Sequence, residues 1–219
     1  MSMEFISELG PRIVARAYEH LTLTFLAMLI AVSIAVPTGI FLARTHLKAV
    51  SDLIMGIVNV IQPIPSLALV AFTVALFNVV GLPTIGLLPG LVSLVAYALL
   101  PILRNTYTGI RQVEPAVSEV AVGMGMTPMQ VLFRVQLPLA LPVIMAGVRI
   151  STVWTIGVAT LVSLVGAGGL GDLIFKGLRS YHMDLVLAGA APAAIMALVL
   201  DWALGFTERW LSPGTSGQA

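Results

Sequence analysis

The feature that most constrains this fold is a long stretch without charge: residues 53–103 contain no Asp, Glu, Lys or Arg. A helix rises about 1.5 Å per residue, so about 20 apolar residues cross the roughly 30 Å hydrocarbon core of a bilayer. The stretch is therefore long enough for two membrane spans and a connecting turn. Residues 21–43 form another uncharged stretch, whose length suits one span.

The composition also indicates an integral membrane protein. Of the 219 residues 58% are hydrophobic and 10% are charged, and the mean hydropathy is +1.03, whereas soluble domains contain about 25% charged residues. The net charge of +1 offers no electrostatic reason to bind nucleic acid. Cysteine is absent, which excludes disulfides and cysteine-ligated metals. The chain begins without a basic segment followed by an apolar one, so we expect no cleavable signal peptide.

Apolar stretches and turn signals together predict an all-α protein with about five transmembrane helices. The glycines and prolines within residues 78–90 mark the turn between the second and third spans. We expect one transmembrane domain over residues 1–219 and a polar, disordered tail over residues 212–219. The expected spans are residues 21–43, 52–77, 87–108, 142–164 and 185–206.

The second span contains residues that would break its ladder of helix hydrogen bonds in the middle of the membrane. Broken backbone at that depth is tolerated where it faces protein or a water-filled cavity, so these residues are candidates for lining a translocation path. An ordinary proline kink packed on a neighbouring helix explains the same residues equally well. The candidates are Gln62, Pro63, Pro65 and Ser66.

Residues 114–138 interrupt the lipid-compatible pattern. They carry Glu114, Glu119 and Arg134, together with a turn signal at residues 123–125. Such a segment is a poor candidate for a span, so we expect it to lie in water on one side of the membrane.

Two short helices are expected inside this segment. Pro115 suits the first turn of an amphipathic helix that the glycines would end. Thr127 and Pro128 suit the N-cap and the first position of a second helix, and the pair at residues 137–138 should end the segment. The apolar face of the first helix is expected at Val117, Val120, Ala121 and Met124.

The segment resembles the cytoplasmic EAA loop of ABC importer permeases. That loop reads Glu-Ala-Ala, three residues, Gly, nine residues, Ile-x-Leu-Pro, and this chain departs from it only by valine at positions 120 and 135. The resemblance implies a coupling helix that sits in a cleft of a separate ATPase subunit. A solvated loop whose glycines serve only its own turns is the alternative. The residues to which the resemblance assigns ATPase coupling are Glu119, Ala121, Gly125, Leu137 and Pro138.

The glycine-rich residues 166–171 match the GxGxxG nucleotide-binding fingerprint, but the setting is wrong. They follow a membrane helix, whereas the fingerprint requires a strand, a turn and a helix, so we reject that interpretation. We expect a glycine-rich turn on the side of the membrane opposite residues 114–138, followed by a short helix over residues 172–178.

The distribution of basic residues predicts the orientation. Seven lie on the side of residues 114–138 and four on the other side, so we expect this loop and the C-terminus in the cytoplasm and the N-terminus outside. The seven are Arg44, Lys48, Arg104, Arg111, Arg134, Arg149 and Arg209, and the four are Arg12, Arg16, Lys176 and Arg179. We place Arg149 near the start of the fourth span.

The chain contains no residues for enzymatic chemistry that we can identify. A GxxxxGK[ST] phosphate loop is absent, so ATP must be hydrolysed by another chain. The three histidines lie at predicted membrane edges, which favours interfacial positions over a metal site. We therefore expect neither a catalytic site, nor a bound metal, nor a cofactor on this chain. The histidines are His20, His46 and His182.

Four segments together resemble permeases for osmoprotectants such as glycine betaine, choline and carnitine: QPIPSLALVAF, LPILRNTYTGI, residues 114–138 and GAGGLGDLIFKGL. The resemblance implies the type I importer (MetI-like) fold and four kinds of partner in the cell membrane. These are two ATPase subunits that use ATP and Mg, a second permease subunit of the same or a paralogous sequence, an extracytoplasmic substrate-binding protein, and lipid. A methionine or other amino-acid permease is the alternative within the class. A secondary transporter or channel would need inverted repeats or ionisable residues at mid-membrane, and we find neither.

Overall fold

A computed structural model describes residues 3–211, with side chains described over residues 9–209. Every regular element in this part of the chain is a helix, as the sequence predicts, while the predicted tail at 212–219 lies outside the described residues. Contacts within the chain divide it into two compact units. Unit 1 comprises residues 1–31, 64–98 and 151–201, and unit 2 comprises residues 32–63, 99–150 and 202–219.

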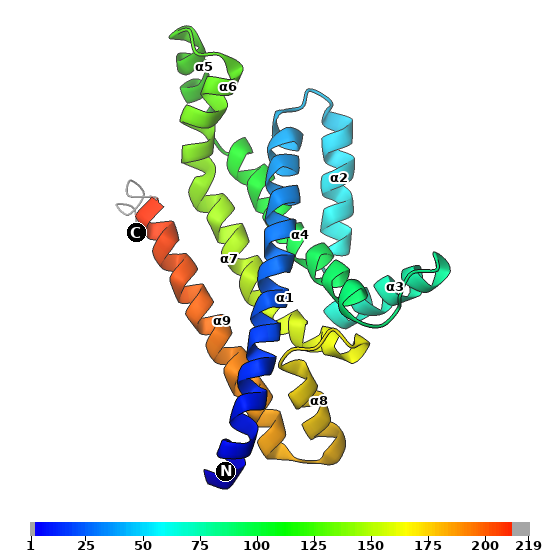
Figure 1. Cartoon of the computed structure of the whole chain (residues 1–219). Coiled ribbons are helices and arrows are strands. Elements are labelled where there is room, and N and C mark those ends of the chain that lie inside the picture. The colour runs from blue at the N-terminus through cyan, green and yellow to red at the C-terminus, as the bar shows by residue number, and fades with distance from the viewer. Residues whose placement is uncertain (1–2, 212–219) are drawn as a thin grey trace. The chain divides into compact units, whose positions relative to one another are not determined.

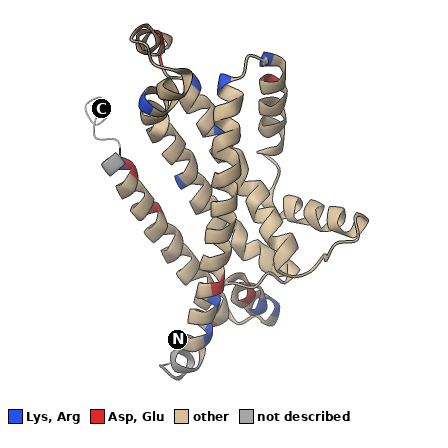
Figure 2. Ribbon diagram, turned by 45° about the horizontal axis from the view of Figure 1, so that its top comes forward, with Lys and Arg blue, Asp and Glu red and all other residues tan. Residues whose placement is uncertain are grey.

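The apolar stretches of the sequence become long helices (Figure 1). Four segments are long and apolar enough to cross a membrane, namely Leu9–Arg44, Leu87–Arg111, Pro128–Val165 and Met183–Arg209. A fifth span results if helices α2 and α3, which are separated by a bend, are counted as one. The prediction of about five spans is therefore confirmed. Figure 2 shows the charged residues mostly toward the ends of the long helices, which suits apolar middles in lipid.

Two elements differ from their predicted ranges. Helix α1 spans Met3–Arg44 and so begins well before the predicted span at 21–43. Its early charged residues are stabilised by pairing one turn apart, since Arg16 lies 2.6 Å from Glu19. The predicted second span consists of two helices, α2 (Lys48–Ile61) and α3 (Ser66–Val79).

Unit 1 is organised around two apolar clusters. The first joins α1, α3, α4 (Leu87–Arg111), α7 (Leu137–Leu161) and the 3-10 helix η2 (Val162–Val165), and its buried residues are Leu23, Ala27, Val70, Leu94, Val158, Ala159 and Val162. The second cluster joins α8 (Gly171–Ser180) to α9 (Met183–Leu211) through Leu170, Leu173 and Ala193.

His20, which the sequence analysis assigned to a membrane edge, has its side chain inside the protein. Its side chain is fully buried in unit 1, and its Nε2 lies 3.1 Å from the carbonyl oxygen of Ile156. A hydrogen bond to a main-chain carbonyl satisfies one polar atom of the ring inside the apolar unit. The partner is distant in sequence, so the local pattern around His20 could not reveal it.

Unit 2 packs parts of α1, α4 and α7 around buried Ala43, Ile110, Leu132, Ala140 and Ile144. Small residues allow close helix contact there: a Cβ on Gly39 of α1 would lie 2.7 Å from the Cβ of Thr106 in α4. Unit 2 also contains the interrupting segment as α5 (Pro115–Gly123), α6 (Pro128–Val131) and the π-helix η1 (Leu132–Gln136). In Figure 1, α5 and α6 lie at the N-terminal end of α7.

Leu137 and Pro138, which were expected to end this segment, are the first two residues of α7. The wide turn of η1 brings the N–H of Leu137 to the carbonyl of Leu132, and α7 then begins with proline at its second position. Proline is tolerated in a first helical turn because its missing N–H needs no partner there. Elements α6, η1 and α7 therefore follow one another without an intervening loop.

Candidate functional site

The predicted break in the second span is present. Helix α2 ends at Ile61, and α3 begins at Ser66 after a proline with ψ 133°, an extended conformation that cannot continue a helix. Gln62 is half-buried, and its Oε1 accepts a hydrogen bond of 3.0 Å from Nη1 of Arg104. Gln62 and Pro63 belong to unit 2, whereas Pro65 and Ser66 belong to unit 1. Their role in a translocation path stays a prediction.

The two short helices predicted between residues 114 and 138 are confirmed. Pro115 occupies the first turn of α5, and the turn after α5 contains Gly125 at φ +86°, a backbone conformation that favours glycine. Thr127 caps α6 with a capping box: its hydroxyl accepts from the N–H of Gln130, while the Gln130 side chain accepts from the N–H of Thr127. The spacing of Thr127 and Gln130, which the sequence analysis did not use, is typical of a capping box.

The apolar face predicted for α5 is divided in the structure. Val120 and Met124 are 62% and 68% exposed, and Val117 is also exposed, so these side chains point to the outside of the loop. Ala121 is only 2% exposed and packs inside it. The loop therefore presents apolar side chains that the described chain does not cover, which is typical of an interaction surface.

Contacts inside unit 2 hold the loop in place. Nη2 of Arg44 donates to the carbonyl oxygen of Pro128 at 2.9 Å, which ties the end of α1 to the start of α6. Nε2 of Gln136 donates to Oγ of Ser118 at 3.4 Å, which ties η1 to α5. Both partners are distant in sequence, and neither contact was signalled by the local pattern.

The structure places the five predicted coupling residues in two groups. Glu119 and Gly125 are exposed on the outer part of the loop, and Pro138 is exposed at the start of α7. Ala121 and Leu137 contribute to the interior of unit 2 instead; Leu137 packs beside the buried cluster that includes Leu132 and Ile110. Their assignment to ATPase coupling is tested by nothing in the geometry and stays a prediction.

Arg149 lies deeper in its helix than the sequence predicts. Because α7 begins at residue 137, Arg149 lies in the middle of this helix and not near its start. Its Nη1 lies 3.6 Å from Oε2 of Glu208 in α9, and Gly205 leaves room for the guanidinium. Charged residues inside membrane segments are expected to pair in this way.

The described residues contain no group of three metal-ligating side chains. The features with functional potential are therefore the loop of α5, α6 and η1 and the break between α2 and α3. Neither brings together groups suited to covalent chemistry, whereas an apolar loop projecting from membrane helices suits docking to a partner chain.

Comparisons with known proteins agree with this arrangement. The chain is 46% identical over 211 residues to the choline transport system permease protein OpuBB of Bacillus subtilis, covering 96% of this chain and 94% of that protein. It is 42% identical over 211 residues to the glycine betaine/carnitine/choline transport system permease protein OpuCB of the same organism, with the same coverage of 96% and 94%.

A solved structure of the methionine ABC transporter MetNI in an inward-facing conformation contains a chain of the same fold. It superposes with a TM-score of 0.81 at 26% identity and covers 96% of this chain and 99% of that one. The type I importer permease fold is thereby confirmed. Residues 35–216 match the family described as binding-protein-dependent transport system inner membrane component, so the predicted role as a transport subunit, not an enzyme, is confirmed as well. The chain belongs to this family of multi-pass inner membrane permeases.

Proposed function

We propose that this chain is a permease subunit of an ATP-driven importer for osmoprotectants that carry a quaternary ammonium group, such as glycine betaine, choline and carnitine. The similarity to the two Bacillus permeases along nearly the whole length of both chains carries this proposal. The methionine alternative rests on a structural neighbour with much lower identity, so we favour the osmoprotectants.

The loop of α5, α6 and η1 is the proposed contact with the ATPase. The exposed Val120 and Met124 supply apolar area, and full burial of such a side chain contributes about 1.5–3 kcal/mol. Glu119 adds a charge at the edge of this surface, and the turn at Gly125 sets its shape. Because α6, η1 and α7 are continuous, a displacement of the docked loop would be transmitted to a membrane helix.

Two of the coupling residues act from inside the loop in this proposal. Ala121 is small enough for α5 to pack closely within unit 2, and Leu137 anchors the start of α7 in the buried cluster. Pro138 fixes the start of α7 after the wide turn of η1.

Residues 62–66 are the proposed lining of the translocation path. Gln62, Pro63, Pro65 and Ser66 are neutral, so they offer no negative charge that would hold a quaternary ammonium group. Recognition then belongs to a separate binding protein, where aromatic side chains can provide cation–π attraction of about 0.5–2 kcal/mol per contact.

The proposed assembly contains two ATPase subunits that use ATP and Mg, a second permease subunit of the same or a paralogous sequence, and an extracytoplasmic binding protein. Residues 1–219 form a single permease domain, with the loop at 114–138 and the C-terminus in the cytoplasm and the N-terminus outside. The bias of seven basic residues to four supports this orientation.

Uptake into vesicles that contain the assembled complex tests the proposal. Labelled glycine betaine, choline and methionine are compared with and without ATP and the binding protein, and a complex with an inactivated ATPase serves as the control. We expect ATP-dependent uptake of betaine or choline only when the binding protein is present. Uptake of methionine alone would replace the substrate assignment, and uptake with the inactivated ATPase would refute ATP-driven import.

A further inference from the structure

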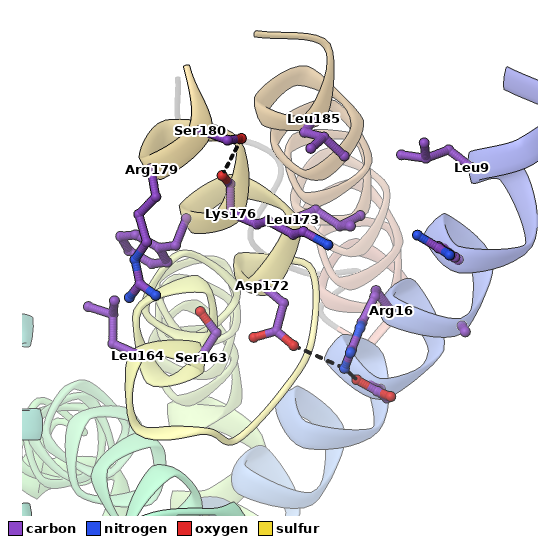
Figure 3. Close-up of a pocket in the computed structure, with 14 residues that line it drawn as sticks. Leu9, Arg16, Ser163, Leu164, Asp172, Leu173, Lys176, Arg179, Ser180 and Leu185 are labelled. Carbon is purple, nitrogen blue, oxygen red and sulfur yellow. Dashed lines mark hydrogen bonds and ion pairs between the residues drawn. The ribbon is translucent and has the colours of Figure 1, made fainter. Parts of the chain in front are cut away.

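A cavity of about 750 Å³ lies in unit 1. Its walls come from the first turns of α1, from η2, from α8 and from the start of α9 (Figure 3). All of these segments belong to unit 1, and none of them takes part in the loop or the helix break described above.

The cavity gathers the basic residues of one side of the membrane. The sequence assigns four of its eleven basic residues to the N-terminal side, and all four line this cavity: Arg12, Arg16, Lys176 and Arg179. Two come from α1 and two from α8. In the proposed orientation these residues lie outside the cytoplasm, where basic residues are disfavoured, so their convergence on one cavity indicates a binding role.

The acidic residues of the cavity are already engaged. Nη1 of Arg16 lies 2.6 Å from Oε2 of Glu19 and 3.0 Å from Oδ2 of Asp172, and Figure 3 shows the contact with Asp172. Glu19 also accepts a hydrogen bond of 3.0 Å from the N–H of Gly169. One arginine thus serves both carboxylates.

The other three basic side chains have no ion-pair partner among the residues that the structure describes. Arg12, Lys176 and Arg179 are exposed, so the cavity carries positive charge that the chain itself leaves uncompensated. Phosphate groups are the usual ligands of such clusters of arginine and lysine.

Most of the remaining lining residues are apolar, and the cavity lies at the end of two candidate spans. Leu9, Phe175 and Leu185 line it, and the spans Leu9–Arg44 and Met183–Arg209 begin beside it. Tyr181, at the C-terminal end of α8, is 94% exposed. Exposed tyrosine together with basic residues is typical of the headgroup level of a bilayer.

We propose that this cavity binds the phosphate headgroup of an anionic phospholipid, with an acyl chain along the apolar wall. The uncompensated cations of α1 and α8 contact the phosphate, while Leu9, Phe175 and Leu185 contact the hydrocarbon. A free inorganic phosphate would satisfy the cations but not the apolar wall, which is why we assign the cavity to a lipid. This inference is independent of which solute the permease carries.

The test measures lipid selectivity of the full-length chain in nanodiscs. Spin-labelled phosphatidylglycerol and spin-labelled phosphatidylcholine are compared by the fraction that the protein immobilises. The test variant is K176Q/R179Q, which removes two exposed charges and no ion pair. The control K48Q/R111Q removes the same charge from exposed residues of unit 2, and K176R/R179K keeps the charge of the cavity.

We expect the wild-type chain to prefer phosphatidylglycerol, and K176Q/R179Q to lose about fivefold in preference for each neutralised side chain at low salt. The preference should fall with added salt because these charges are exposed to screening. The control and the charge-retaining variant should match the wild type, and millimolar inorganic phosphate should not displace the lipid. Equal preference in wild type and K176Q/R179Q, equal loss in the control, or displacement by phosphate would each overturn the proposal.

Discussion

Replacing Gly171 by alanine should destabilise unit 1 strongly. Gly171 is the first residue of α8 and is buried where α8 packs against the end of α7. A Cβ at this position would overlap the carbonyl oxygen of Thr160 and the hydroxyl of Ser163, and it would lie 2.7 Å from the carbonyl carbon of Thr160. Because the main obstacle is backbone, no rotamer change can relieve the overlap, and α8 must move away.

The cost follows from overpacking. Inserting a carbon into a well-packed interior typically costs 1–3 kcal/mol, and a backbone obstacle favours the upper end, about 3 kcal/mol. Moving α8 would also disturb Leu170 and Leu173, which are 0% and 7% exposed. At about 2–4 °C per kcal/mol for a chain of this length, the melting temperature should fall by about 6–12 °C. Fluorescence-detected size-exclusion chromatography of heated, detergent-solubilised protein measures this shift.

Gly157→Ala is the matched control for this variant. Gly157 lies in α7 of the same unit, and a Cβ there has nothing within 4 Å. The same chemical change should be neutral, or stabilising by up to about 1 kcal/mol, because alanine is the better helix former. Melting temperatures of the two variants within about 2 °C of each other would refute the packing argument.

Two further predictions concern the loop. Gly125→Trp should leave the protein inserted but abolish ATP-dependent uptake. Gly125→Asn should keep most of the uptake, because asparagine tolerates the φ of +86°. Full uptake by Gly125→Trp would refute a coupling role, and equal loss of uptake in both variants would point to strain in the turn. Single cysteines at Ser118 and Ser2, in a chain without native cysteine, should react differently with an impermeant thiol reagent added to intact cells. We expect labelling at position 2 only, and labelling at position 118 only would reverse the orientation.

Much of the fold follows from the sequence because a bilayer restricts composition so severely. The charge-free stretch at 53–103 is long enough for two spans and a turn. Helix α4 begins at Leu87, which is the residue predicted for the start of the third span. Residues that break or cap helices were equally informative in the loop, where Pro115 and Thr127 occupy the predicted positions. These signals are local, and the chemistry behind them does not depend on tertiary contacts.

The local sequence could not show contacts between residues that are distant along the chain. The fourth span was expected to begin at residue 142, but α7 begins at Leu137, so Arg149 lies in the middle of this helix. There it meets Glu208 of α9. Likewise, the position of His20 in the sequence does not reveal the carbonyl of Ile156, which its ring contacts in the interior of unit 1.

The glycine-rich residues 166–171 show why a motif needs its structural setting. In a nucleotide-binding fold the glycines serve a tight turn and close approach to a phosphate. Here Gly168 and Gly169 have φ of +82° and +85°, so they serve the turn after η2. Gly171 instead serves the close approach of α8 to the backbone of Thr160. The spacing GxGxxG therefore arises from a turn followed by tight helix packing, and that packing places Asp172 within reach of Arg16 on α1.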